Sequence, residues 1–157
     1  MRIFCDLDGV LTDFDGRFFE LFGKYPNEFI DTYGYSSFWA SFTRQAEDFW
    51  SGIKWKNDGK KLWQFIRPYN PIILSSVPPS MAKIATKYKE KWIRDELGLD
   101  IEYYITSRKE KQNYSDQGSI LIDDMKKNID EWLLRGGIGI LHISAENTIK
   151  ELKKIGL

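Results

Sequence analysis

The sequence is poor in the residues that most often carry redox, disulfide or zinc chemistry. Its 157 residues include one cysteine, Cys5, and one histidine, His142. A single cysteine excludes an internal disulfide and a metal cluster held by several cysteines. Cys5 lies inside an apolar run and is interpreted as a small buried strand residue. His142 lies in the last predicted strand, and we interpret it as structural.

An excess of either charge is also absent, as is any long hydrophobic run. Lys and Arg together number 23, as do Asp and Glu, so no overall field draws the chain toward nucleic acid or acidic lipid. No apolar stretch approaches the length of a membrane span. The strand-like run that begins at residue 2 leaves no room for a signal peptide. We therefore expect a cytoplasmic protein with no membrane partner.

The apolar residues that are present gather in short runs typical of buried strands. Such runs, apolar on both faces, indicate a parallel sheet covered by helices. They occupy residues 2–5, 71–74, 101–105, 119–122 and 138–142. Helical spacing follows at residues 80–97, 126–134 and 145–155. The alternation of strands and helices after residue 70 predicts an α/β fold with a doubly wound parallel sheet.

The connection between the first two strands is too long for a single crossover helix. It contains helical patterns at residues 16–23, 38–50 and 58–67, and it holds seventeen of the 24 aromatic residues. We expect a small helical cap at residues 15–69, inserted after the first strand. Residues 1–14 and 70–157 then form the α/β core. Many of the aromatic side chains must build the cap's own core.

Two pairs of carboxylates follow two of the predicted strands. Asp6 and Asp8 end the first strand, within the motif DLDGVLTD, and Asp123 and Asp124 end the fourth. Ligands of open α/β sheets bind at the carboxyl ends of the strands, so both pairs are expected at one edge. Aspartate after a strand is also common as a turn residue or helix cap. The joint pattern favours a functional site.

Carboxylates brought this close repel one another and are costly to bury. A hard divalent cation relieves that repulsion, and oxygen ligands of this kind suit Mg²⁺. The sequence therefore predicts a Mg²⁺ site.

These motifs resemble the haloacid dehalogenase superfamily of phosphohydrolases, and all four family motifs can be placed in order. The resemblance implies that Asp6 attacks phosphorus and forms an aspartyl-phosphate. It implies that Asp8 protonates the leaving oxygen and then deprotonates the attacking water. Mg²⁺ would be held by a carboxylate oxygen of Asp6, the backbone carbonyl of Asp8 and Asp124, with Asp123 acting from behind them.

The same resemblance supplies residues for the phosphate. Ser75 would hydrogen-bond the phosphoryl oxygens, and Ser76 stands beside it in the second family motif. The third motif is a lysine before the fourth strand. Lys111 best matches the family spacing, and Lys109 is the second candidate.

Within the superfamily, the chain is most similar to the 5′(3′)-deoxyribonucleotidases and their phage and bacterial relatives. Phe14 ends the opening run, whose final Phe lines the base site in that family. Phe38 and Trp39 resemble the cap segment that packs on the nucleobase. This resemblance implies a 5′-nucleotidase that hydrolyses (deoxy)nucleoside monophosphates. The alternative for Phe38 and Trp39 is a place in the core of the cap.

Other functions stay open. A basic helical face could track a nucleic-acid backbone and serve a 3′-phosphatase; it comprises Lys83, Lys87, Lys91 and Arg94. A solvated helix surface explains the same pattern, and we do not expect a nucleic-acid partner. A small-metabolite phosphatase and an inactive nucleotide-binding protein are further alternatives. The sequence does not give the oligomeric state, although exposed cap aromatics would suit a homodimer.

Overall fold

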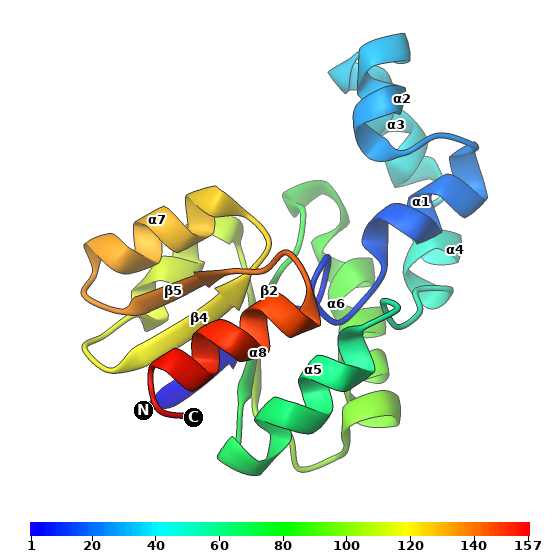
Figure 1. Cartoon of the computed structure of the whole chain (residues 1–157). Helices are drawn as coiled ribbons and strands as arrows, with labels where there is room; N and C mark the ends of the chain where they lie inside the picture. Colours follow the sequence, from blue (N-terminus) through cyan, green and yellow to red (C-terminus); the bar gives the residue numbers. More distant parts are fainter.

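A five-stranded parallel sheet forms the centre of the computed structural model, which describes all 157 residues (Figure 1). Its strands are β1 (Arg2–Cys5), β2 (Ile72–Ser76), β3 (Tyr103–Thr106), β4 (Ser119–Asp123) and β5 (Ile138–Leu141). They are arranged in the order β3-β2-β1-β4-β5, so β1 lies at the centre. The predicted strands are all present, with ends that differ by at most two residues. The predicted doubly wound α/β fold is confirmed.

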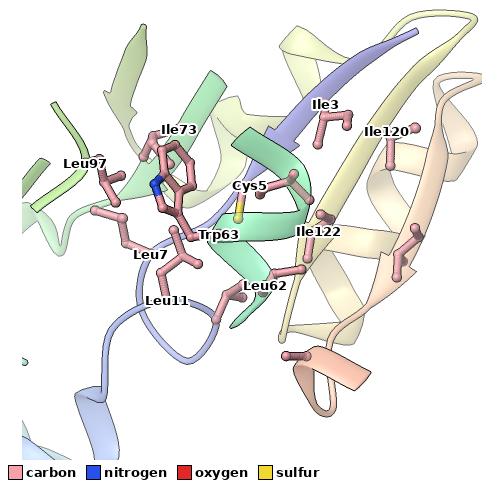
Figure 2. Packing of buried hydrophobic residues seen from close by; sticks show 14 of the residues in the cluster. Ile3, Cys5, Leu7, Leu11, Leu62, Trp63, Ile73, Leu97, Ile120 and Ile122 are labelled. Atoms are coloured by element: carbon pink, nitrogen blue, oxygen red, sulfur yellow. The ribbon is translucent and has the colours of Figure 1, made fainter. Parts of the chain in front are cut away.

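Alternation along β1 directs side chains into two cores, one on each face of the sheet. Ile3 and Cys5 point into the larger core, which also contains Leu62 and Trp63 (Figure 2). Phe4 points the other way and packs on Trp132, with 5.2 Å between the ring centroids. Strands buried on both faces explain why the apolar runs in the sequence show no polar alternation.

Helices cover both faces of the sheet. The larger core is closed by α5 (Gly59–Ile66), α8 (Ala145–Lys154) and the end of α6 (Ala82–Trp92), which continues as a π-helical turn, η3 (Ile93–Leu97). The smaller core is closed by α7 (Lys126–Leu134) and the 3-10 helix η4 (Arg108–Tyr114). Two short 3-10 helices, η1 (Arg67–Tyr69) and η2 (Pro79–Met81), flank β2. No helix is both long enough and apolar enough to cross a membrane.

Four helices between β1 and α5 form a separate layer that projects from the sheet (Figure 1). They are α1 (Phe14–Phe22), α2 (Pro26–Tyr33), α3 (Tyr35–Arg44) and α4 (Ala46–Ser51). The helix predicted at residues 38–50 is divided at Gln45 into α3 and α4. Helix α2 was not predicted. Pro26 at its first turn and the side chain of Glu28, which accepts from the Tyr25 backbone N–H, stabilise its start.

Aromatic rings fill the interior of this layer. Phe18 is fully buried there and lies within 6.2 Å, between ring centroids, of Phe22, Phe29, Phe38 and Phe42. The same cluster includes Met81 and Ala85, which belong to η2 and α6. The aromatic cluster therefore attaches the four helices to α6.

Helix α5 does not belong to this aromatic cluster, although we expected it in the cap. Leu62, Trp63 and Ile66 pack in the larger core of the sheet. A Cβ on Gly59 would lie 2.6 Å from the backbone oxygen of Leu11, so the helix approaches the β1 loop closely. The division into core and cap stays a prediction, but we infer that the cap ends before α5, near residue 52.

His142 is buried at the end of β5, and it is not among the residues that line the main pocket. Its Nδ1 lies 2.8 Å from the Thr148 hydroxyl oxygen. Burial, followed by the charge of Lys56, lowers the pKa of His142 to about 4, against an opposing effect of Asp58. These surroundings favour the neutral imidazole.

We expect His142 to contribute to acid sensitivity. The unfolded chain binds a proton at this residue near pH 6.5 and the folded chain only near pH 4, so stability falls as the pH drops through that window. His142→Gln should reduce the loss of unfolding free energy between pH 7 and pH 4.5 by roughly 1–2 kcal/mol. Urea unfolding at both pH values measures this difference. Equal losses of unfolding free energy in the wild type and in His142→Gln would contradict the expectation.

Candidate active site

The β1 strand ends in a tight loop that presents two carboxylates. Backbone N–H groups of residues 10–12 donate to the Leu7 carbonyl, and Gly9 N–H donates to the Thr12 carbonyl. Gly9 has a φ of 78°, which an L side chain rarely adopts. This loop holds Asp6 and Asp8 at the edge of the main pocket, which both residues line.

The tip of β4 lies directly beside the tip of β1. The Lys111 ammonium lies 2.8 Å from a carboxylate oxygen of Asp6 and 2.8 Å from one of Asp123. A Cβ on Gly9 would lie 2.1 Å from a carboxylate oxygen of Asp124, so any larger residue there would force this carboxylate to move. The chain order of the sheet reverses between these two strands, which is where ligands of doubly wound folds bind.

Lys111 is almost fully buried in η4 between two carboxylates. Burial alone would lower the pKa of its ammonium, but the charges of Asp6 and Asp123 outweigh that effect and raise the pKa above its ordinary value. Lys111 does not line the pocket, whereas Lys109 does. The choice of Lys111 as the phosphate lysine therefore stays a prediction.

Asp123 is fixed by a full set of hydrogen-bond donors. One carboxylate oxygen accepts from the Met125 backbone N–H, the other from Lys111, and the Asn128 amide donates to both. Burial, and then the neighbouring charge of Asp6, raise the pKa of Asp123. With its acceptor sites occupied, Asp123 is suited to orient its neighbours.

Asp124 differs because no lysine or arginine pairs with it, although it lines the same pocket. Asp124 is exposed to solvent, yet the protein atoms around its carboxylate, followed by the charges of Asp6 and Asp123, raise its pKa to about 7. Carboxylate oxygens of Asp6, Asp123 and Asp124 lie within 4.8 Å of one another.

The charges around this cluster fit a divalent cation. Two buried lysines, Lys89 and Lys111, face four carboxylates, so two negative charges remain when all are ionised. Oxygen-only donors of this kind suit Mg²⁺. Asp6, Asp124 and the backbone carbonyl of Asp8 would hold it, with Asp123 behind them.

The two serines after β2 occupy different places. Ser75 is fully buried, and its hydroxyl oxygen accepts from the Lys89 ammonium at 2.8 Å. Ser76 lines the pocket. Ser76 is thus in reach of a ligand, whereas Ser75 faces the interior. The predicted contact of both serines with phosphate remains untested.

The pocket has a volume of about 700 Å³ and combines a charged floor with an aromatic wall. The wall is formed by Phe14, Tyr35, Trp39 and Trp50. Arg108 also lines the pocket and makes a double contact with Glu131, at 2.8 and 3.2 Å. This contact anchors the start of η4, which carries Lys109.

Phe38 does not line this pocket, contrary to the expectation that it contacts the base. It is buried in the cap, where its ring lies 5.1 Å from that of Phe18. Successive residues of a helix point about 100° apart, so Phe38 and its neighbour Trp39 face different surroundings. Trp39 does line the pocket.

Lys89 is a residue of the site that we did not predict. Its ammonium is within hydrogen-bonding distance of Asp8, and the side chain is only 3% exposed. A signal was present in the sequence. Lys89 shares a helical face with Ala85 and Trp92, so it interrupts an otherwise apolar stripe. The exposed lysines around it conceal that signal.

Comparison with known proteins supports the fold and no finer assignment. No family model matches the sequence. No curated protein matches it either. Among solved structures, the chain is similar to "putative beta-phosphoglucomutase from Thermotoga maritima", with a TM-score of 0.53 and 12% identity. The alignment covers 99% of this chain and 100% of that one. The chain has a haloacid dehalogenase-like fold.

Two further structures are similar at lower scores. One is a HAD family hydrolase from Deinococcus radiodurans R1 with bound phosphate and sodium, at a TM-score of 0.47, 12% identity and coverage of 99% of this chain and 87% of that chain. The other is the HAD domain of the effector protein Lem4 from Legionella pneumophila, at 0.45, 14% identity and coverage of 98% and 92%. Both TM-scores are below 0.5, so neither structure contributes to the assignment of the fold.

The close approach of Gly9 to Asp124 gives a test of the cation site. Gly9→Ala should displace the Asp124 carboxylate and weaken Mg²⁺ binding by roughly tenfold or more. The rise in melting temperature on adding Mg²⁺ reports that affinity. Gly23→Ala is the matched control, because Gly23 has a similar φ of 69° and a Cβ there would meet no atom within 4 Å. An unchanged Mg²⁺ response in Gly9→Ala would refute the proposed ligand arrangement.

Proposed function

We propose that the chain is a Mg²⁺-dependent phosphomonoesterase that acts through an aspartyl-phosphate on Asp6. The observation that carries the proposal is the position of the Asp6 carboxylate and the partners that hold it. Asp6 lines the pocket, one oxygen accepts from the Leu7 backbone N–H at 2.8 Å, and the other faces Lys111. These contacts hold the Asp6 carboxylate in one orientation at the pocket, which suits a positioned nucleophile.

We assign a residue to each step of this reaction. An oxygen of Asp6 attacks phosphorus, the bond from phosphorus to the leaving oxygen breaks, and Asp8, which must be protonated at this step, gives that oxygen its proton. Asp8 then takes a proton from water as the water attacks phosphorus, which releases phosphate and restores Asp6. Ser76 and Lys109 line the pocket where phosphoryl oxygens would lie. Mg²⁺, when bound, would neutralise charge on the phosphoryl group.

The proposed substrates are nucleoside 5′-monophosphates. A pocket of about 700 Å³ has room for one, and three rings of its aromatic wall, Phe14, Tyr35 and Trp39, are exposed enough to offer flat surfaces for a base. Stacking on such a ring contributes about 1–3 kcal/mol per base and accepts any base. The resemblance to deoxyribonucleotidases supports the same substrate class.

Substitution of the two proposed catalytic carboxylates should have different effects. Asp6→Asn should abolish turnover because the amide is a poor nucleophile, while substrate binding is largely kept. Asp8→Asn should lower kcat about 10²–10⁴-fold, the usual contribution of an acid–base group. Steady-state hydrolysis and trapping of a phosphorylated chain measure both effects. Normal turnover by Asp6→Asn would rule out the nucleophile assignment.

Trp39 should contribute to base binding. Trp39→Ala should raise KM for nucleoside monophosphates by roughly 5- to 100-fold, the equivalent of one lost stacking contact. KM for p-nitrophenyl phosphate should change less. Tyr33→Ala is the control, since Tyr33 is an exposed cap aromatic that does not line the pocket. Equal effects on both substrates would place Trp39 outside the base site.

A substrate panel tests the proposed function as a whole. Nucleoside monophosphates, sugar phosphates and oligonucleotides with a 3′-phosphate should be assayed with and without Mg²⁺. We expect Mg²⁺-dependent hydrolysis that favours the monophosphates. Preference for oligonucleotides, with activity that falls steeply as salt rises, would support a 3′-phosphatase instead.

A further inference from the structure

A second buried lysine lies beneath the proposed acid–base residue. The Lys89 ammonium contacts Asp8, the Ser75 hydroxyl oxygen at 2.8 Å and the Ser76 carbonyl oxygen at 2.8 Å. An ammonium has three hydrogens to donate, so these three acceptors use all of them. Lys89 does not line the pocket. Its chemistry is therefore directed at protein atoms.

Burial of this charge needs a reason. A lysine that is 3% exposed is costly to desolvate, and an apolar side chain of the same length would fill the space without that cost. The ammonium also lies 5.0 Å from the centre of the Trp50 ring, which belongs to cap helix α4. Lys89 thus connects four segments: α6, the β1 loop, the end of β2 and the cap.

The effect of these contacts falls on Asp8. One of its carboxylate oxygens accepts from the Thr12 hydroxyl at 2.9 Å, and the other faces Lys89. Partners at both oxygens restrict rotation of the carboxylate. Accurate placement of this group matters, because proton transfer requires hydrogen-bonding distance to the leaving oxygen.

We propose that Lys89 is a positioning residue that fixes the Asp8 carboxylate for proton transfer and links it to the Trp50 wall of the pocket. This inference rests on the proposed function. Lys89 and Lys111 then have separate tasks: Lys111 orients Asp6 and Asp123, whereas Lys89 orients Asp8.

Lys89→Met tests the proposal, because methionine keeps much of the length and removes the charge. We expect kcat for the preferred nucleoside monophosphate to fall about 10²-fold, the lower end of an acid–base contribution, with KM changed less than threefold. The loss should be smaller for p-nitrophenyl phosphate, whose leaving group needs no proton. Lys83→Met, an exposed lysine on the same helix, should behave as wild type.

A double-mutant cycle separates positioning of Asp8 from a general structural effect. If Lys89 acts through Asp8, then Asp8→Asn with Lys89→Met should be no more than about threefold slower than Asp8→Asn alone. Losses that multiply would overturn the proposal. The double variant can be compared with Asp8→Asn even if Lys89→Met alone does not fold. It removes both charges of the Lys89–Asp8 pair, so neither charge is left buried without its partner.

The outcomes also distinguish the two proposals. Wild-type protein that hydrolyses no phosphomonoester with Mg²⁺ would overturn the proposed function and this inference together. An active wild type with Lys89→Met equal to Lys83→Met would overturn the role of Lys89 alone. The role of Lys89 would be supported if Lys89→Met lowered kcat only for substrates with poor leaving groups. The same substitution should then cause no further loss when it is added to Asp8→Asn.

Discussion

The structure depends on bringing like charges together at the junction of β1 and β4. Four carboxylates meet there, and repulsion between them would separate the strand tips if nothing opposed it. Lys111 opposes it most directly, since its ammonium bridges the two tips from within the protein. The apolar registers of β1 and β4 supply the rigid frame that holds the charges in place.

Much of the fold could be predicted because the strands are apolar on both faces. The runs that became β1 and β4 contain no polar alternation, and only a sheet covered on both sides buries them. The carboxylate pairs were equally predictable, since they follow those runs directly. Their convergence then depends only on β1 and β4 being neighbours.

The remaining features depend on contacts between distant segments, which local patterns do not record. Helix α5 has an apolar face that would suit either the cap or the sheet, and its packing in the sheet core, with Gly59 close to Leu11, decides between them. Phe38 and Trp39 are chemically alike, and their separation depends on the rotation of α3. Lys89 resembles the exposed lysines of α6 until the neighbouring segments are in place.

The pocket wall also carries an intrinsic optical signal. Trp39 and Trp50 both line the site, and the ammonium of Lys89 lies against the Trp50 ring. A ligand that stacks on the partly exposed Trp39 indole changes its environment directly, whereas Trp132 is buried in the smaller core of the sheet. Occupancy of the unmodified protein can therefore be followed by tryptophan fluorescence, with no label attached to protein or ligand.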